Sequence, residues 1–485
     1  MIYLFVAIFT AVVLVILLSD SFNFIALANI AAMLVISGII AVIAIFVYRY
    51  NVINLLDKAI YIDSLSLLNL LIIATIGLIA VIYSRKYLEA ELREQSISIG
   101  RVKLFYILFS LFIISMIFVC ICNNVVAMWI GLEATTLSTA FLIGFNRTKL
   151  SLEAAWKYVI ICSLGIGIGL IGIILSIYSL KAPMTEEVLN WTFLAANSRL
   201  LDPNVAKLAF VFIFIGIGTK AGLAPMHTWL PDGHSEAPSP ISAMMSGVLL
   251  NIAMYVIIRF YIVIKLVDKL SAFRYMFIIF GCISLLIAAF SILRQNNYKR
   301  LLAFSSIENM GIITLGIGFG GVIGTFGALL HSIIHAYGKT LLFLVSGNIL
   351  SAYGTKRTDK IHYMIRTMPL NSVMLILGIL VITGAPPFAA FYSELSILLE
   401  GVRQGQYIAV AIFALCLLIA FAAFFSIFVK MLFTGDDSVE YKRLDGDRTN
   451  SLPLFLTFIF IIGTSLYFGG YLAEIIRRAA SIIGA

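Results

Sequence analysis

Long apolar runs recur along almost the whole of this 485-residue sequence, and they constrain its fold more than any other feature. About fourteen of them are long enough to cross a bilayer as a helix. Because backbone groups in hydrocarbon must be hydrogen-bonded within the chain, an apolar run of this length spans as a helix. The sequence therefore predicts an all-α polytopic membrane protein with helices at residues 2–18, 24–47, 65–83, 104–122, 125–145, 159–179, 206–223, 241–263, 273–293, 302–319, 323–350, 373–399, 408–433 and 452–471.

The overall composition excludes an ordinary soluble enzyme. The chain is 62% hydrophobic and 12% charged, with a mean hydropathy of +1.07. Its net charge of +9 is spread over connecting loops, without a basic tract interleaved with aromatic residues, so lipid is an expected partner and nucleic acid is not. The five cysteines lie within apolar runs at spacings that fit neither disulfides nor an iron-sulfur site, and they are interpreted as small buried hydrophobes.

The distribution of basic residues predicts the orientation in the membrane. Lys and Arg gather in the loops at residues 85–101, 147–149, 294–300, 356–360 and 442–448. The positive-inside rule places these loops in the cytoplasm, so the chain is expected in the cell inner (cytoplasmic) membrane with both termini outside. Basic residues at 265–274 argue against this orientation. The first run lacks a basic leader and a small-residue cleavage site, which predicts a retained helix.

The stretch at residues 206–259 joins two spanning runs through a segment rich in proline and histidine, including His227 and His234. Lys220 lies within the first run, where a lysine costs roughly 3 kcal/mol on insertion scales. Gly222 and Pro225 follow it closely, which predicts a helix broken inside the membrane beside a titratable amine. A lysine that snorkels from a helix end is the alternative.

Two further charges lie near this element in the predicted bundle. Glu133 is well inside the run 125–145, where an ionised carboxylate needs a cation, and Lys220 is its predicted partner. Such a pair transfers one proton when its members separate, because each then tends toward its neutral form. Lys157 is either a second member of this relay or an interfacial lysine between two aromatic residues.

The run 323–350 carries His331, His335 and Lys339 at successive i+4 positions, so they form one polar stripe on a helix. Histidines four apart can bind zinc, but the HExxH glutamate is absent and no third ligand is evident. A proton path fits the spacing better, because the imidazole pKa near neutrality lets each ring accept and release a proton. No metal site is therefore expected.

A second broken helix is predicted in the run 373–399. Pro386 and Pro387 remove two backbone donors, and Glu394 follows them. Two breaks five helices apart predict two inverted five-helix repeats, helices four to eight and nine to thirteen, as in a two-half-channel ion translocator. The predicted units are residues 1–102, an N-terminal three-helix segment, 103–265 and 266–434, the repeats, and 435–485, a loop and the last helix.

Two other features have simpler interpretations. Gly165, Gly167 and Gly169 spell a dinucleotide-like GxGxG, but no strand of a soluble domain precedes them. Close packing of helices is the favoured explanation. The moderately polar loop at residues 181–204 is expected to cap the outer face, with no functional role assigned.

At these residues the sequence resembles the antiporter-like subunits of complex I, Mrp sodium/proton antiporters and membrane-bound hydrogenases. Among these, the corresponding component of hydrogenase-4-type complexes looks nearest. The likeness covers most of the chain and is most specific around Lys220. The matching segments are DSLSLLNLL, YSRKY, WIGLEATTLSTAFLIGF, AAWKYVI, GTKAGLAPMHTWLPDGHSEAPSPISAMMSGVLL, YKRLLAFSSIENMGI, HSIIHAYGKTLLFLVSGN and TGAPPFAAFYSEL.

The resemblance implies a proton relay at the middle of the membrane. Its carriers would map onto Glu133, Lys220, His331, His335 and Glu394. Where many family members have a lysine in the eighth helix, this chain has Asn251, which cannot titrate. The central link is then expected to run through water, ordered by Asn251 and Tyr255, or through His335 and Lys339.

The resemblance also implies a function. We expect a non-catalytic, proton-translocating subunit of a membrane-bound hydrogenase or a ferredoxin/quinone oxidoreductase. This chain would bind no cofactor, and a nickel-iron centre and iron-sulfur clusters would lie in a peripheral redox module beside other antiporter-like subunits. The alternatives are a subunit of an Mrp-type antiporter that moves protons and sodium, and a membrane partner in an inorganic-carbon uptake complex.

Overall fold

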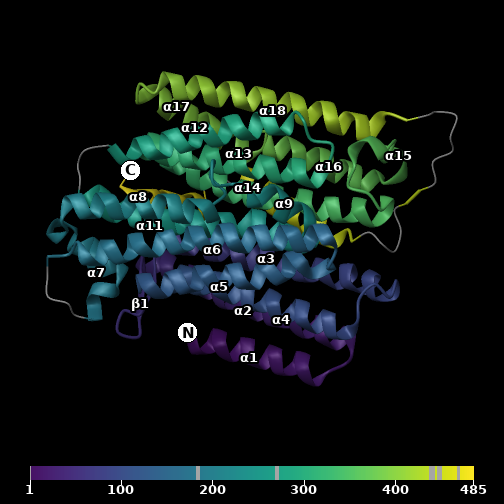
Figure 1. The fold of residues 1–485 in the computed structure, drawn as a ribbon, viewed down its shortest axis with the longest axis horizontal. Coiled ribbons are helices and arrows are strands. Elements are labelled where there is room, and N and C mark those ends of the chain that lie inside the picture. The colour runs from purple at the N-terminus through teal and green to yellow at the C-terminus, as the bar shows by residue number, and fades with distance from the viewer. Residues whose placement is uncertain are drawn as a thin grey trace.

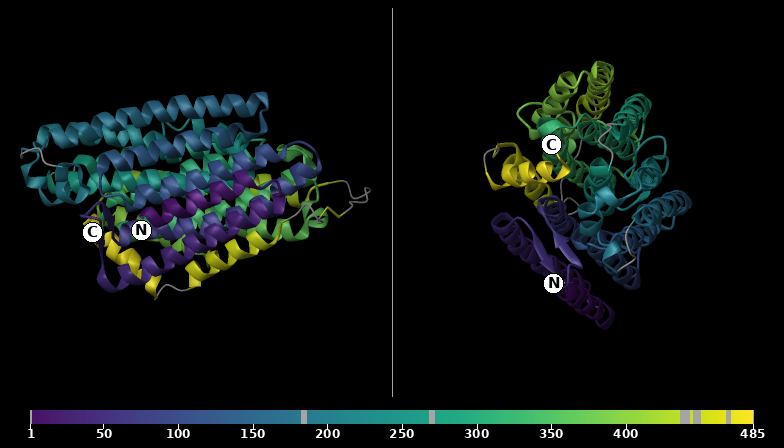
Figure 2. Two further views of the ribbon diagram at one scale, coloured as in Figure 1. Left: turned by 90° about the horizontal axis from the view of Figure 1, so that it is seen from below. Right: turned by 90° about the vertical axis from the view of Figure 1, so that its left-hand side faces the viewer.

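The computed structural model describes residues 2–181, 186–267, 272–435, 443–444, 450–466 and 470–484. The helices run side by side along one direction, and both ends of the chain lie toward the same end of the bundle (Figures 1 and 2). A two-stranded antiparallel sheet, β1 (Ile53–Leu55) and β2 (Ile60–Ile62), lies between the second and third helices. The chain is thus a helical polytopic membrane protein, as its apolar runs predict.

The first part of the chain, through residue 267, forms the helices that carry the first predicted break. These are α1 (Ile2–Leu18), α2 (Phe22–Tyr50), α3 (Ser64–Arg93), α4 (Ile99–Ile121), α5 (Val125–Ile143), α6 (Lys149–Tyr178), α7 (Trp191–Ala196), α8 (Pro203–Lys220), α9 (Trp229–Glu236), α10 (Ser239–Met244) and α11 (Leu250–Val267). A π-helical turn, η4 (Met245–Leu249), joins α10 to α11.

The second part carries the other predicted break. Its helices are α12 (Ala272–Ile292), α13 (Tyr298–Phe319), α14 (Gly321–Tyr353), α15 (Met364–Thr367), α16 (Pro369–Ile382), α17 (Ala389–Arg403), α18 (Tyr407–Phe433), α19 (Leu452–Leu466) and α20 (Tyr471–Ile483). The predicted run 373–399 is divided between α16 and α17, and residues 467–469 of the last run lie outside the described residues.

The structure supports fewer single-helix spans than the sequence predicts. Within the described residues, eleven helices are long and apolar enough to cross a membrane, or twelve if α19 and α20 form one bent span. α1 and α16 are shorter apolar helices. The predicted number of about fourteen came from counting apolar runs in the sequence. An apolar run that is interrupted does not form one continuous helix, so it is not counted as a single-helix span. The repeats and the unit boundaries stay predictions.

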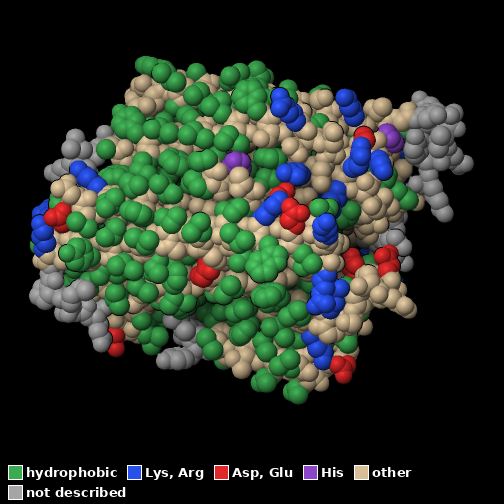
Figure 3. Space-filling view, viewed as in Figure 1, with side chains coloured by type: hydrophobic (Ala, Val, Ile, Leu, Met, Phe, Trp, Pro, Cys, Tyr) green, Lys and Arg blue, Asp and Glu red, His purple; other side chains and the backbone are tan. Residues whose placement is uncertain are grey.

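The centre of the bundle is formed by helices that are largely or wholly buried. α14 packs against α13, α16, α17 and α19, while α3 packs against α2, α4, α10 and α20. The apolar stretch of α13 and that of α10 through α11 are buried throughout. Outer helices such as α6 and α18 expose large apolar side chains, which cover most of the face in Figure 3. Polar groups on the central helices are therefore shielded from lipid.

Capping residues fix where the functional helices begin. The Asn124 side chain accepts from the backbone of Val126 and Ala127 at the start of α5, and Thr148 accepts from Ser151 at the start of α6. α8 begins with a proline preceded by a capping aspartate. Each cap satisfies amide groups that the first turn of a helix leaves without partners.

The GxGxG glycines bring α6 and α8 close together. A Cβ on Gly165 would lie 2.6 Å from Thr219 Cβ, and one on Gly216 would lie 2.3 Å from the nitrogen of Gly169. A Cβ on Gly167 would meet nothing within 4 Å. Close helix packing is therefore confirmed at Gly165 and Gly169, while Gly167 does not contribute. The five cysteines are free and buried, also as predicted.

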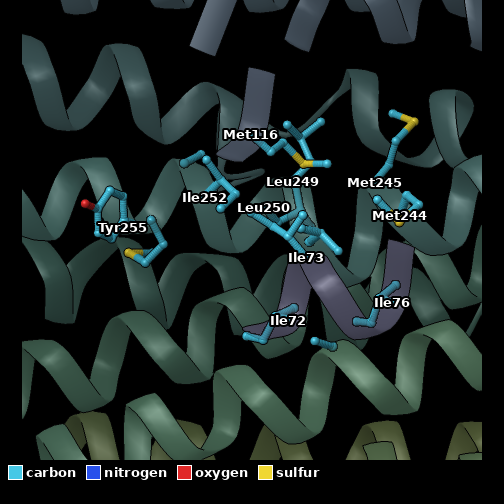
Figure 4. Packing of buried hydrophobic residues seen from close by; sticks show 14 of the residues in the cluster. Ile72, Ile73, Ile76, Met116, Met244, Met245, Leu249, Leu250, Ile252 and Tyr255 are labelled. Carbon is cyan, nitrogen blue, oxygen red and sulfur yellow. The ribbon is translucent and has the colours of Figure 1, made fainter. Parts of the chain in front are cut away.

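The π-helical turn η4 lies in the centre of the core. Met245 and Leu249 lie among apolar residues of α3 and α4, including Ile73 and Met116 (Figure 4). A Cβ on Gly247 would lie 2.8 Å from the carbonyl oxygen of Ala336 on α14. Single π-turns often mark functional sites. Here the wide turn and the glycine let α14 approach the span formed by α10, η4 and α11.

A buried ion pair fastens the bundle at the end where both termini lie. Arg259 donates to both carboxylate oxygens of Asp63, at 2.7 and 2.6 Å, and their side chains are 1% and 0% exposed. The guanidinium lies 4.5 Å from the ring of Trp191, whose Nε1 donates to the Arg259 carbonyl. The described part of the 181–204 loop thus anchors α7 on this pair, which connects α3 to α11.

On the face drawn in Figure 3, most basic side chains lie toward the other end of the bundle, where Figure 1 places α15. One residue of the predicted basic loops, Lys299, is buried inside the protein. Lys299 is 1% exposed, and its Nζ donates to the carbonyl oxygen of Ala237 at 2.8 Å. The carbonyl at the end of α9 thus holds the Lys299 ammonium group inside the protein, which explains why this loop lysine is buried.

Replacing Arg259 with Met should strongly destabilise the protein. The change leaves the Asp63 carboxylate buried without its cation, which typically costs about 3–5 kcal/mol. We expect a lower midpoint of thermal unfolding for the purified protein in detergent. Lys58→Met, which removes the exposed pair with Glu187, is the control and should cost at most about 1 kcal/mol. Equal effects of the two substitutions would contradict a special role for the buried pair.

Candidate functional site

Lys220 ends α8 and is fully buried. Its Nζ donates to Thr136 Oγ1 at 2.8 Å and to the Tyr158 hydroxyl at 2.5 Å, and it lies 4.7 Å from the Tyr158 ring. The Tyr158 hydroxyl also bonds to Thr139 at 2.5 Å. The amine is therefore held by α5 and α6 inside the bundle and does not reach the membrane surface from a helix end.

Glu133 lies on α5, one helical turn before Thr136, but it does not form the predicted direct pair with Lys220. Its Oε1 accepts from Ser163 of α6 at 2.7 Å, and its Oε2 is buried without a hydrogen-bond partner. Since Thr136 takes the contact with Lys220, a hydroxyl stands where the ion pair was expected. The Lys220 amine, which belongs to α8, therefore contacts α5 one turn from Glu133, and the two groups are not bonded to each other.

The two interruptions have similar local geometry. Gly222 and Gly384 each lie two residues past a helix end with φ of +73° and +66°, a backbone conformation that favours glycine. Pro225 follows the first, and Pro386 and Pro387 follow the second. A serine from another helix satisfies a backbone amide at each interruption: Ser284 accepts from residue 224 and Ser465 from residue 389, at 3.0 and 3.1 Å. The chain can therefore leave the helix inside the bundle.

Aromatic side chains connect the Lys220 site to the second part of the chain. The Trp229 ring lies 4.9 Å from Tyr158 and 5.9 Å from His234, and His234 lies 5.8 Å from Phe343 of α14. His234 is fully buried; its Nδ1 contacts the Leu230 carbonyl, while its Nε2 has no partner. His234 thus lies between the Lys220 site and α14 of the second part.

The second set of predicted residues lies where α13, α14 and α17 meet. His331 Nε2 lies 3.0 Å from Asn309 Oδ1, and its Nδ1 lies 2.9 Å from the hydroxyl of Ser393, which precedes Glu394. Lys339 is fully buried and donates to the Leu302 carbonyl at 3.0 Å and to the Ser305 hydroxyl. One face of α14 is therefore joined to both neighbouring helices by polar contacts.

His335 and Asn251 occupy the middle of the structure. His335 is 1% exposed, and neither ring nitrogen has a hydrogen-bond partner. Asn251 donates to the carbonyls of Gly247 and Ser332, at 3.0 and 3.1 Å, and its Oδ1 has no partner. The Tyr255 hydroxyl instead bonds to Ser66 and to the Cys120 carbonyl beside Arg259, and no hydrogen bond between it and Asn251 or the histidines is found among the described residues.

Two predicted residues lie apart from this interior. His227 is only partly buried beside the first interruption, and its Nδ1 has no partner. Lys157 is 46% exposed and forms ion pairs with Glu153 at 2.6 Å and Asp232 at 3.2 Å; Asp232 also pairs with Arg300. This is the environment that the interfacial alternative predicts for Lys157, and its membership of the relay stays a prediction.

The structure adds a residue that sequence reasoning missed. Glu308 of α13 is 3% exposed and lies within the segment YKRLLAFSSIENMGI. The available signal was the carboxylate itself, since acidic residues inside a spanning run mark functional sites. Among the described residues, no three or more His, Cys, Asp or Glu are grouped to hold a metal. A hollow of about 380 Å³ lies elsewhere, between α4, α5 and α6 near Arg101 and Arg147.

Comparisons with known proteins identify the family. A family model described as NADH:quinone oxidoreductase/Mrp antiporter, TM, matches residues 122–420. Another, described as NADH-Ubiquinone oxidoreductase (complex I), chain 5 N-terminus, matches residues 55–96. The chain belongs to the NADH:quinone oxidoreductase/Mrp antiporter family of membrane subunits. The resemblance to antiporter-like subunits seen in the sequence is thereby confirmed.

One relative of similar sequence and two solved structures of similar fold agree with this assignment. The Hydrogenase-4 component F homolog of Methylacidiphilum infernorum is 35% identical over 347 residues, which cover 71% of this chain and 72% of that protein. The fold matches a chain of the membrane-bound sulfane sulfur reductase, an archaeal respiratory membrane complex, with a TM-score of 0.87, 23% identity and coverage of 99% and 96%. It also matches a chain of the Mrp complex from Dietzia sp. DQ12-45-1b, with a TM-score of 0.85, 19% identity and coverage of 99% and 96%.

Lys157→Gln tests the two interpretations of Lys157 directly. Because this lysine lies in an exposed ion-pair cluster, we expect the rate of proton translocation in vesicles to stay within about twofold, as the modest energy of such pairs implies. The amount of assembled complex should be unchanged. A loss as large as that caused by replacing Lys220 would instead return Lys157 to the relay.

Proposed function

We propose that this chain is the proton-translocating membrane subunit of a complex I-like membrane-bound hydrogenase or ferredoxin/quinone oxidoreductase. In this proposal protons move along buried Glu, Lys and His side chains between the two interrupted helices. The family membership supports a role in ion translocation. The Hydrogenase-4 component F homolog, as a relative over most of both chains, favours the hydrogenase-type complex.

One observation carries the proton path. Ten buried side-chain N and O atoms of the described residues have no hydrogen-bond partner, and seven of them belong to the predicted relay: Glu133, His227, His234, Asn251, both nitrogens of His335, and Glu394. Leaving such an atom unpaired costs about 1–3 kcal/mol, so buried polar atoms are normally paired with protein or water. Water molecules bonded to these atoms would join the side chains into a continuous proton-conducting path.

The first step of the path follows from the contacts of Lys220. Its ammonium group can pass a proton through the Tyr158 and Thr136 hydroxyls, which both contact Nζ. Glu133 lies one turn away on the same helix as Thr136, so its carboxylate can accept this proton when the amine becomes neutral. Among the described residues no carboxylate forms an ion pair with Lys220, so its proton is not held in place by a fixed negative charge and can be exchanged.

The partners belong to the proposal as well. The two matched structures come from multi-subunit membrane complexes, which supports a place for this chain beside other antiporter-like subunits. We propose that the nickel-iron centre and iron-sulfur clusters lie in a peripheral redox module. The chain would lie in the cell inner membrane with both termini outside, an orientation that its basic end supports.

Lys220→Met should abolish ion translocation while leaving most of the electron-transfer activity of the complex. Methionine fills similar space but carries no proton, so the relay is interrupted at its buried amine. The complex is purified through a tag on this chain, placed in vesicles, and driven with reduced viologen as the electron donor. A pH-sensitive dye reports proton movement, and electron transfer is measured in parallel.

Lys430→Met is the matched control, because Lys430 is exposed near the end of α18. It should leave both activities unchanged. Unaltered pumping by Lys220→Met would refute the proposed relay. A sodium-dependent pH change in the absence of an electron donor would favour the Mrp-type alternative over a redox-driven complex.

A further inference from the structure

We propose that Glu308 is a proton-binding member of the relay and connects Lys339 to Glu394; this inference rests on the proposed function. The argument begins with the surface of α13 that faces α14. Ser305, Glu308 and Asn309 occupy positions i, i+3 and i+4, so they lie on one face of that helix. This face carries the polar contacts between the two helices.

Both neighbours of Glu308 on this face are bonded to α14. Ser305 accepts from Lys339 Nζ, and Asn309 Oδ1 lies 3.0 Å from His331 Nε2. α13 and α14 run in opposite directions from the connecting Gly320. The two contacts therefore place Glu308 opposite the turn of α14 between Lys339 and His331, the turn that carries His335.

The surroundings of this position favour a group that exchanges protons. Glu308 is 3% exposed, and no hydrogen bond joins it directly to His335 in the described chain. The nitrogens of His335 lack partners, so a water molecule between the two side chains would satisfy both. On one side Ser305 accepts from Lys339, and on the other Asn309 leads through His331 to Ser393, the residue before Glu394. Glu308 thus lies on α13 between the contacts to Lys339 and those to the Glu394 segment.

A titratable Glu308 matters because the residue at the corresponding central position of this chain, Asn251, cannot titrate. Asn251 lies where many relatives are expected to have a lysine, and its amide donates to two backbone carbonyls. A side chain that cannot titrate cannot carry the central proton. Glu308 supplies a titratable group from a different helix, one turn from Ser305, which accepts from Lys339.

The proposed step starts from a neutral group, with a Lys339 ammonium, a protonated Glu308 and an ionised Glu394. Glu308 gives its proton to the Glu394 carboxylate, directly or through water, so one O–H bond breaks and another forms. Lys339 then gives one proton to the Glu308 carboxylate, which breaks an N–H bond, forms an O–H bond and leaves a neutral amine. Glu394 releases its proton along the path, and Lys339 is reprotonated from the side of His335 and His234, which restores the starting state.

Glu308→Gln is the decisive variant, because it keeps the size and hydrogen-bonding capacity of the side chain but cannot exchange a proton. We expect it to lower proton translocation at least about tenfold, as for loss of a proton-transfer group, while subunit assembly and electron transfer persist. Glu308→Asp retains a carboxylate and should recover part of the pumping. The assay uses the complete complex in vesicles.

Glu400→Gln is the matched control. Glu400 is also buried, at 5% exposure, but its side chain accepts from Gln404 at 2.7 Å and lies beside Gly321 and Gly324 at the start of α14, two turns before His331. It should pump normally. In infrared difference spectra, a proton-sensitive carboxyl band should disappear in Glu308→Gln and remain in Glu400→Gln.

Normal pumping by Glu308→Gln would overturn the inference, as would an equal loss in Glu400→Gln, which would show only that a buried amide is harmful. These outcomes are distinct from failure of the proposed function. If Lys220→Met stops pumping and Glu308→Gln does not, the relay stands without Glu308. If neither variant affects pumping, both proposals are wrong.

Discussion

The burial of charge inside an apolar bundle is the constraint on which the rest of this structure depends. The chain meets it in two ways. Asp63 and Arg259 form a two-bond ion pair, which fixes both charges and fastens three segments together. Lys220 and Lys339 are held by hydroxyl and carbonyl oxygens instead. An ammonium group held by neutral acceptors can lose its proton without leaving an anion unpaired, so the second solution is compatible with proton transfer.

The interrupted helices follow from the same constraint. A continuous helix hydrogen-bonds all of its own backbone N–H and C=O groups inside the membrane. An interruption leaves some of these polar groups exposed within the bundle. Here α8 ends at the buried Lys220, and α17 begins five residues before Glu394. Gly384 leaves room for the Glu394 carboxylate, because a Cβ there would lie 1.9 Å from its Oε2. The backbone at each interruption and the charge beside it are therefore accommodated together.

Local signals explain what the sequence could predict. Proline and glycine reveal where a helix must end, and the i+4 spacing of His331, His335 and Lys339 places them on one face without any tertiary information. Contacts between distant segments were not predictable in the same way. Asp63 and Arg259 are 196 residues apart, and Lys299 resembled an ordinary loop lysine until its contact with the end of α9 was known. The prediction of a direct pair between Glu133 and Lys220 was wrong for a similar reason. The Thr136 hydroxyl accepts from Lys220 in place of the carboxylate, and the sequence alone does not reveal which acceptor the lysine contacts.

Three buried titratable side chains lie on α13, α14 and α17, and their net charge limits which of them can hold a proton at the same time. In the proposed relay Lys339 is the cation of this group, and Glu308 and Glu394 are its two buried carboxyl groups. Two buried anions beside a single ammonium would leave an excess negative charge, which is unfavourable in apolar surroundings. The neutral state of the group therefore holds one proton on either carboxylate. Because the two positions compete for that proton, its transfer between them leaves the charge of the group unchanged and avoids the cost of exposing a new charge to the apolar core.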